Sequence, residues 1–175
     1  TSRAGAQVEP LTPGPSPPGG EGRKISSPRC GMTPTLTHRL VLPTDANHHG
    51  TLYAGSLLRI VLEAAYATAW RHIGAEANIV LKRVLNIECQ RPVKIGSVIE
   101  IQGAVVFRAR AYLVTGLIGT PLKPGQARWV EALMGFAQVD AKGRPAEIPD
   151  EVPAVEVPTG EHWTKLCGRL DKLKR

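Results

Sequence analysis

The longest apolar stretch of the chain runs from Ala54 to Ile73, is rich in Leu and Ala, and contains no Pro. It is too long for a typical strand, so the pattern predicts a helix that ends at Gly74. Because the segment is apolar nearly all round, we expect protein to surround the helix. Arg59 and Glu63 interrupt the apolar run, and no membrane-spanning segment or membrane partner is predicted.

Shorter segments on both sides of this helix alternate between apolar and polar residues, which is typical of half-buried strands. Leu85, Ile87 and Cys89 show this alternation, and Cys89 is expected to be a small core residue at the inward end of its strand. One strand, a helix and then four strands predict an α+β fold, with a largely antiparallel sheet of about five strands around one central helix. The predicted strands cover residues 37–43, 78–89, 97–107, 112–119 and 128–140.

The two ends of the chain differ from this central part. Residues 1–31 are dominated by Pro, Gly and Ser, which predicts a disordered tail. The sequence begins with Thr, and Met32 precedes the first predicted strand, so we expect Met32 to be the functional start. Residues 32–150 form the predicted domain. Residues 151–175 are expected to be a linker and an amphipathic helix that packs on the domain or a partner subunit, with a weak contact to an anionic surface as the alternative.

Composition and charge exclude several classes of protein. The net charge of +7 lies mostly in the two ends of the chain. The predicted domain shows no basic face interleaved with aromatic residues, so no nucleic-acid partner is expected. The three cysteines are far apart and form no CxxC pair, which predicts neither a disulfide framework nor a metal site and favours a reducing compartment, the cytoplasm.

Three motifs around the predicted helix resemble those of hotdog-fold acyl-CoA thioesterases. Residues 45–55, DANHHGTLYAG, resemble the D-x-N-x-x-G-x-x-x-G-G stretch of that family, with Ala54 in place of the first Gly of the final pair. Residues 91–96, RPVKIG, resemble its R-P-V-x-x-G turn, and residues 136–145, FAQVDAKGRP, resemble its last strand with the D-x-x-G-R-P ending. The chain is thus similar to 4-hydroxybenzoyl-CoA thioesterase-like proteins and acyl-CoA hydrolases, and the resemblance implies the hotdog fold.

The resemblance also implies a function. It implies an enzyme, a thioester hydrolase that converts an acyl-CoA or a related acyl thioester into the free acid and CoA. Coenzyme A is then part of the substrate, and no separate cofactor is expected. Monomers of this fold pair their sheets and share an active site, so the expected partners are a small-molecule acyl thioester and a second copy, in a homodimer or a higher homo-oligomer.

One departure from the family pattern concerns the acid. The usual catalytic carboxylate follows the last Gly of the motif by seven residues, and that position is Leu62 here. Glu63 comes one residue later, and one residue turns a helix by about 100°. The fluoroacetyl-CoA thioesterase-like branch resembles this chain at Glu63, whereas its His and Thr fall at Cys89 and Gly55. The departure leaves open a non-catalytic hotdog module that binds acyl thioesters.

Thioester hydrolysis needs an activated water or a nucleophile and a group that holds the developing oxyanion. We expect Glu63 to be the general base or nucleophile, Asn47 to orient the water or the carbonyl, and the N–H of Gly55 or Ser56 to bind the oxyanion. Each residue has a structural alternative. Arg59 would pair with Glu63 along the helix, Asn47 would bond to its own loop, and Gly55 would only permit a tight turn. Pairing of Glu63 with Arg59 away from the loop favours the binding module.

A second group of residues is expected to bind the substrate. In hotdog thioesterases, basic groups near strand ends hold the CoA phosphates, although each one here is also explained as a solvated charge. His48 and His49 are adjacent and lack the spaced partners of a metal site, and Asp45 is expected to cap the loop. The predicted substrate-binding residues are His49, Tyr53, Ser56, Arg91, Lys94, Arg108 and Arg110.

Overall fold

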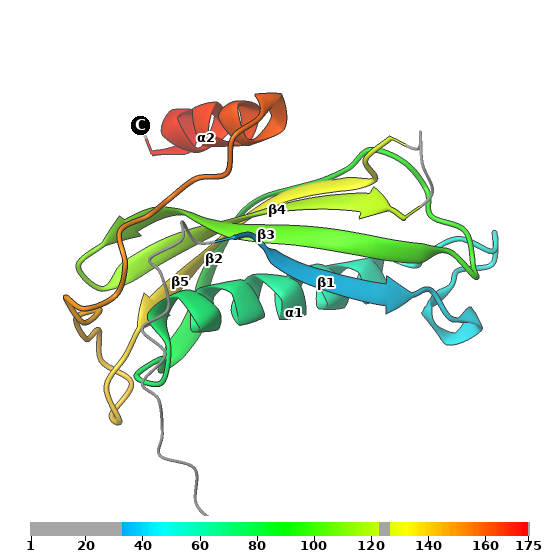
Figure 1. Cartoon of the computed structure of the whole chain (residues 1–175). Coiled ribbons are helices and arrows are strands. Elements are labelled where there is room, and N and C mark those ends of the chain that lie inside the picture. Colours follow the sequence, from blue (N-terminus) through cyan, green and yellow to red (C-terminus); the bar gives the residue numbers. More distant parts are fainter. Residues whose placement is uncertain (1–32, 123–126, 175) are drawn as a thin grey trace, which may run out of the picture. The chain divides into compact units, whose positions relative to one another are not determined.

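The computed structural model describes residues 33–122 and 127–174, so the predicted tail of residues 1–31 lies outside the described residues. The described part contains one antiparallel sheet with the strand order β1-β3-β4-β5-β2. Helix α1 lies on one face of this sheet and α2 on the other (Figure 1). The elements in chain order are β1 (Thr35–Leu40), a short 3-10 turn η1 (Pro43–Asp45), α1 (Ala54–Ile73), β2 (Ile79–Cys89), β3 (Val98–Ala109), β4 (Tyr112–Pro121), β5 (Val130–Gln138) and α2 (Glu161–Leu173).

The predicted α+β architecture is confirmed, and the central helix has the predicted bounds. Gly74 follows α1 with a positive φ of 86°, a conformation that disfavours other residues and ends the helix. The strands begin or end one to a few residues away from the predicted limits, because side-chain alternation does not mark where the ladder of hydrogen bonds stops. The 3-10 turn η1 within the β1–α1 connection was not predicted.

The core lies between α1 and the inner face of the sheet. The helix buries Ile60, Val61 and Ala65, among others, against residues of β3, β4 and β5. Gly103 in β3 permits a close approach of the two elements, since a Cβ there would lie 2.1 Å from Oγ1 of Thr68 in α1. The helix and the sheet therefore form two packed layers, and this packing fixes the position of α1 on the sheet.

Two expectations about burial are wrong for the single chain. Helix α1 is not surrounded, because Leu58, Tyr66 and Trp70 are exposed on the side that faces away from the core. Cys89 is also exposed rather than in the core. Strand β2 is an edge strand with two register irregularities, between Leu81 and Arg83 and between Val84 and Asn86, and such irregularities interrupt the simple alternation from which its burial was inferred.

Helix α2 covers part of the outer face of the sheet. Trp163, Leu166 and Leu170 are buried there against apolar residues of β3, β4 and β5. Arg169 adds ion pairs to Glu88 in β2 at 2.7 Å and to Glu131 in β5 at 3.7 Å. The terminal helix therefore packs on the rest of the domain within one chain. Neither described helix is both long and apolar enough to span a membrane.

His72, near the end of α1, is a buried histidine in an unusual environment. It is 4% exposed, and its Nε2 has no hydrogen-bond partner among the described residues. It lines a small cavity of about 20 Å³ together with Thr68 and Thr35, which is room for roughly one water molecule. Burial, and secondarily the positive charge of Arg108, lower the pKa of His72 from its usual value of 6.5.

The lowered pKa of His72 predicts a loss of stability in weak acid. The unfolded chain takes up a proton at His72 near pH 6.5, whereas the folded chain resists it. The stabilisation is therefore complete above about pH 6.5 and falls as the pH drops toward the folded-state pKa. Urea unfolding between pH 5 and pH 8 measures the free energy of unfolding. As the pH falls, this free energy should decrease more steeply for the wild type than for His72→Gln. His48→Gln, a change at an exposed histidine, should keep the wild-type slope, and equal slopes in all three proteins would contradict the prediction.

Candidate functional site

The connection between β1 and α1 is a loop that is fastened to a second loop before β3. Asp45 ends the 3-10 turn, and Gly50 adopts a positive φ of 70° at the tip of the following hairpin-like segment. The N–H of Leu52 donates to the carbonyl of Val93 at 2.8 Å, and the N–H of Ile95 donates to that of Gly50 at 3.1 Å. The two motifs noted in the sequence, residues 45–55 and 91–96, are therefore neighbours in space.

Asn47 is held inside this loop by its side-chain oxygen. The Oδ1 atom accepts hydrogen bonds from the N–H of His49 at 2.9 Å, the N–H of Thr51 at 3.2 Å and the hydroxyl of Thr51 at 3.2 Å. The loop bonding named as the alternative role of Asn47 is thus present. The Nδ2 atom makes no hydrogen bond that the structure records within the described part of the chain, so it is available to an incoming group.

The N-terminus of α1 offers backbone N–H groups without a side-chain cap. Tyr53 is the N-cap residue, and the first intrahelical bond runs from the N–H of Leu57 to the carbonyl of Tyr53 at 2.9 Å. The N–H groups of Ala54, Gly55 and Ser56 precede it and have no acceptor inside the helix. The ring of Tyr53 lies over Gly55, since a Cβ at residue 55 would be 2.5 Å from Tyr53 Cε1. Glycine at this position therefore permits the observed placement of the tyrosine ring.

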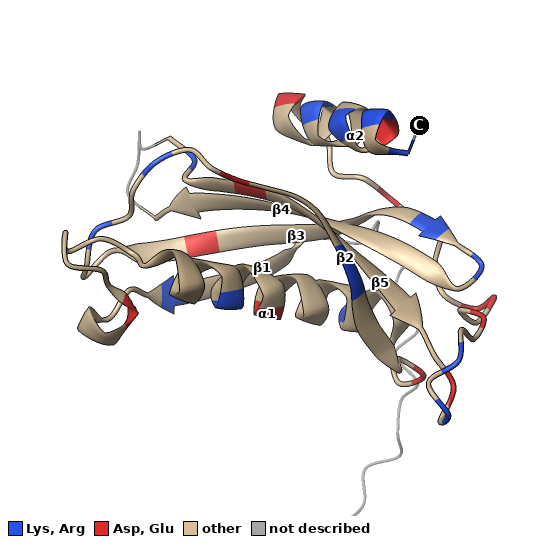
Figure 2. Ribbon diagram, turned by 180° about the vertical axis from the view of Figure 1, so that it is seen from behind, with Lys and Arg blue, Asp and Glu red and all other residues tan. Residues whose placement is uncertain are grey.

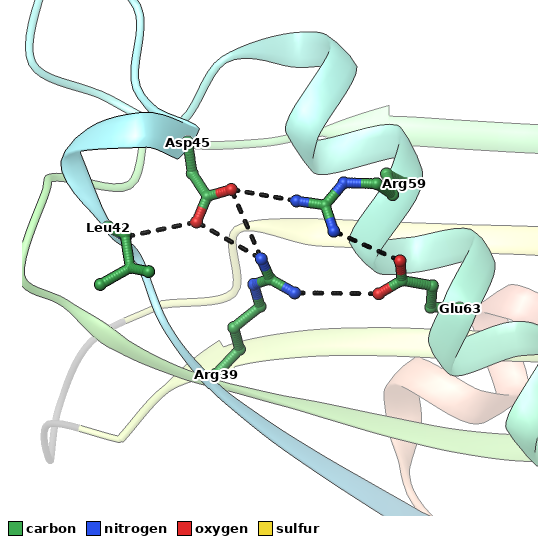
Figure 3. A network of polar contacts seen from close by, with 5 residues as sticks. All are labelled: Arg39, Leu42, Asp45, Arg59 and Glu63. Atoms are coloured by element: carbon green, nitrogen blue, oxygen red, sulfur yellow. Dashed lines mark hydrogen bonds and ion pairs between the residues drawn. The ribbon is translucent and has the colours of Figure 1, made fainter.

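A buried carboxylate, Asp45, links the loop to β1 and α1 (Figure 3). Asp45 is 3% exposed and accepts a hydrogen bond from the N–H of Leu42 at 3.3 Å. Its Oδ1 also accepts from Arg59 of α1 at 3.1 Å and from Arg39 of β1 at 3.4 Å. Asp45 caps the loop as predicted, and its bonds to two arginines were not predicted, since no local pattern in the sequence connects these three positions.

Glu63 lies at the other side of the same arginines (Figure 3). Its Oε1 is 3.3 Å from Nη1 of Arg59, and its Oε2 is 3.8 Å from Nη1 of Arg39. The helix pair that was the alternative to catalysis at Glu63 is therefore formed. The Glu63 side chain is nevertheless 57% exposed and that of Arg59 49% exposed, and exposed ion pairs of this kind stabilise by no more than about 1 kcal/mol.

The four predicted phosphate-binding residues fall into two separate pairs. Arg91 and Lys94 are exposed on the loop before β3, and Lys94 forms a backbone bridge with Thr51. Arg108 and Arg110 lie at the far end of β3, roughly 35 Å along the strand. Arg108 donates to the carbonyls of Val152 at 2.7 Å and Pro149 at 2.8 Å, and Arg110 pairs with Glu147. In the view of Figure 2, Lys and Arg are scattered over loops, strands and both helices rather than gathered on one face.

Within one chain the structure brings together Asn47, His49, Tyr53, Gly55 and Ser56, along with Arg91 and Lys94 on the adjoining loop. The rings of His48 and His49 are exposed, with centroids 3.8 Å apart. Among the described residues no group of three His, Cys, Asp or Glu side chains is arranged to hold a metal ion. Sequence reasoning missed Thr51, although its place four residues after Asn47 matches a side chain that closes an Asx-type loop.

Comparisons with known proteins find one family model and several solved structures that are similar to this chain. The family model described as the thioesterase superfamily matches residues 49–120. Among solved structures, an apo-hexameric acyl-CoA thioesterase is 26% identical over 81% of this chain and 90% of its own, with a TM-score of 0.67. A comparison with curated protein sequences finds no match.

Two further structures are similar in fold. The acyl-CoA hydrolase from Staphylococcus aureus, in complex with butyryl coenzyme A, coenzyme A and coenzyme A disulfide, is 21% identical over 81% of this chain and 84% of its own, with a TM-score of 0.65. A hexameric thioesterase from Yersinia pestis is 21% identical over 65% of this chain and 93% of its own, with a TM-score of 0.60. The predicted hotdog architecture is confirmed by these matches.

The carboxylate network predicts that Asp45 matters more for stability than Glu63. Asp45→Asn removes the charge from a buried group with three donors, which should lower the free energy of unfolding by about 1–3 kcal/mol. Glu63→Gln changes an exposed pair and should cost less than about 1 kcal/mol. Urea unfolding at pH 7 measures both values. Equal costs for the two variants would show that the burial of Asp45 has no energetic consequence.

Proposed function

We propose that this chain is a hotdog-fold member of the thioesterase superfamily and that it hydrolyses an acyl-CoA thioester to the free acid and coenzyme A. The observation that carries the proposal is the meeting of the Asn47 loop with the uncapped N-terminus of α1. The loop carries the NH2 group of Asn47, and the helix N-terminus that follows it carries the N–H groups of Ala54, Gly55 and Ser56. The solved relatives that share this fold include acyl-CoA thioesterases and an acyl-CoA hydrolase, and they supply the substrate class of the proposal.

In the proposed mechanism the backbone N–H groups of Gly55 and Ser56 bind the oxygen that becomes negative when the thioester carbonyl is attacked. These groups carry the positive end of the α1 dipole, equivalent to roughly half an elementary charge. Donors already fixed in place need no reorganisation during the reaction, and this preorganisation supplies much of the rate enhancement of such sites. The helix supplies it here because α1 is held along its length by the sheet.

Glu63 is the proposed general base. It takes a proton from a water molecule, the hydroxide adds to the thioester carbon, the C–S bond breaks, and the thiolate of coenzyme A takes the proton back from Glu63. Release of Glu63 from its arginines is inexpensive because the pairs are exposed to solvent.

The position of Glu63 in the sequence differs from that of an acidic residue in one similar protein. Alanine variants of the Staphylococcus aureus hydrolase include replacements of an asparagine and of an aspartate that are fifteen positions apart in that protein. Asn47 and Leu62 have the same separation here. The acid is thus displaced by one residue along α1, to Glu63, and the proposed water lies accordingly nearer to the side of the helix that carries Arg59.

Arg91 and Lys94 are the proposed contacts of the coenzyme A phosphates on this side of the site, since the loop that carries them is bonded to the Asn47 loop. His49 and Tyr53 border the same place as substrate-binding residues. Arg108 and Arg110 lie at the opposite end of β3 from the Asn47 loop. In this proposal they bind phosphate only on a more distant part of coenzyme A or on the substrate of another subunit.

We also propose that the enzyme assembles as a homodimer, alone or as the unit of a higher oligomer such as a hexamer. Strand β2 is an edge strand with exposed Val80 and Val84, and α1 exposes Tyr66 and Trp70. A second copy would cover this apolar surface and the unpaired strand edge. Two of the similar structures are hexameric. The free thiols of Cys89 and Cys167 suit the cytoplasm as the place of action.

The activity predicts release of free thiol from acyl-CoA substrates. Short, medium and aryl acyl-CoAs should be turned over by the wild type, and Glu63→Gln should lower kcat by at least about 100-fold because the variant has no base. Glu161→Gln, a change at an exposed glutamate of α2, is the matched control and should keep the wild-type kcat. Folded protein that binds coenzyme A but turns over none of the substrates would favour the non-catalytic binding module.

The assembly predicts that charge on the exposed apolar surface weakens association. Val84→Asp in β2 or Tyr66→Asp in α1 should lower the molar mass measured by light scattering at micromolar concentration, because each places a charge in the buried interface. Val157→Asp is the matched control, since Val157 is also exposed but lies before α2. A wild-type protein that is monomeric at every concentration would refute the proposed assembly.

A further inference from the structure

Thr51 makes a contact that the proposed mechanism does not use. Its hydroxyl donates to Oδ1 of Asn47 at 3.2 Å, beside the backbone N–H of Thr51 itself and the N–H of His49. Thr51 is fixed from the other side as well, because it forms a backbone bridge with Lys94 and precedes Leu52, which donates to Val93. Its β-branched side chain has few rotamers, so the hydroxyl is held in place against the asparagine.

Three donors on one oxygen determine which way the Asn47 carboxamide faces. A carboxamide has an oxygen that accepts and a nitrogen that only donates. A flipped side chain would set its NH2 group against the N–H of His49, the N–H of Thr51 and the hydroxyl, and at least the two backbone groups can only donate. The oxygen is therefore occupied by the loop donors, and the NH2 group is the part of Asn47 that remains for another acceptor.

The exposed NH2 group restricts what Asn47 does in the reaction. It offers a proton to a carbonyl oxygen or an oxyanion, and it does not accept a proton from water. Asn47 lies six residues before Tyr53, the N-cap of α1. The loop between them is closed by a hydrogen bond from the N–H of Asn47 to the carbonyl of Thr51 at 2.8 Å. The loop that carries the side-chain donor thus leads directly into the end of α1 that carries the backbone donors.

We propose that Thr51 is a positioning residue: its hydroxyl holds the Asn47 carboxamide with the NH2 group toward the thioester carbonyl, so that Asn47 acts as a donor to the developing oxyanion. This inference rests on the proposed thioester hydrolysis and assigns to Asn47 the carbonyl rather than the water. Of the three donors to Asn47 Oδ1, the hydroxyl is the one that a substitution removes without changing the backbone.

The first experiment compares Thr51→Val with Thr51→Ser in the thiol-release assay. Valine keeps the shape and loses the hydroxyl, and kcat should fall about fivefold to tenfold, the effect of one hydrogen bond. KM for the acyl-CoA and the midpoint of thermal unfolding should stay at their wild-type values. Serine keeps the hydroxyl and should recover most of kcat. Thr164→Val is the matched control, since the Thr164 hydroxyl donates to the carbonyl of Gly160 in α2, far along the chain from the loop.

The second experiment tests whether Thr51 acts through Asn47. Asn47→Asp keeps an oxygen for the three loop donors and replaces the NH2 group by a second oxygen, so the loop should stay folded while kcat falls at least about 100-fold. In this background Thr51→Val should lower kcat no further, and a double-mutant cycle measures the coupling. The inference would be overturned if Thr51→Val lowered kcat as much in the Asn47→Asp background as in the wild type. It would also be overturned if either variant alone kept the wild-type kcat, and in both cases the proposed hydrolysis itself would stand. A wild-type protein without turnover would overturn the proposed function, and the role of Thr51 with it.

Discussion

The buried carboxylate of Asp45 is the interaction on which the arrangement of the site depends. A charged group that is 3% exposed is costly to bury unless it is paired and hydrogen-bonded. Asp45 meets this condition with the N–H of Leu42 and with the guanidinium groups of Arg39 and Arg59. These partners come from the loop, from β1 and from α1. One side chain therefore fastens the loop that carries Asn47 to the two elements that border it.

The two faces of the sheet pack against different helices. The inner face packs against α1 and so fixes the direction of the helix axis and the position of its N-terminus. The outer face is partly covered by α2, whose Leu166 is fully buried and whose Arg169 bonds to β2 and β5. With both faces occupied, exposed apolar side chains remain on the edge strand β2 and on the solvent side of α1, and others lie on β1 and on loops. The proposed second copy would cover the apolar surface of β2 and α1, and the candidate site begins at the N-terminus of that same helix.

The candidate site consists mainly of donors. In the proposed mechanism the N–H groups at the start of α1 and the NH2 group of Asn47 donate to a developing negative charge, and the loop contacts hold the Asn47 side chain before a substrate arrives. The acid is arranged differently, since Glu63 is exposed and shared between two arginines. The part of the site that would stabilise charge, the Asn47 loop and the start of α1, is therefore held by hydrogen bonds. The part that would move a proton, Glu63, is open to solvent. Such a division fits a reaction in which the oxyanion is stabilised inside the protein while water enters from solvent.

The sequence by itself determined the features that depend on local patterns. The Leu- and Ala-rich run without Pro and the glycine after it specify α1 and its end, and the motif around Asn47 locates the loop, because periodicity and turn chemistry act between residues close in the chain. Only the tertiary structure decided which distant residues meet. It joined Asp45 to Arg39 and Arg59, separated Arg108 from Arg91 by the length of β3, and exposed Cys89 on an irregular edge strand. Those outcomes depend on strand order and register, which are set by the packing of the whole sheet around α1 and which no local stretch of sequence specifies.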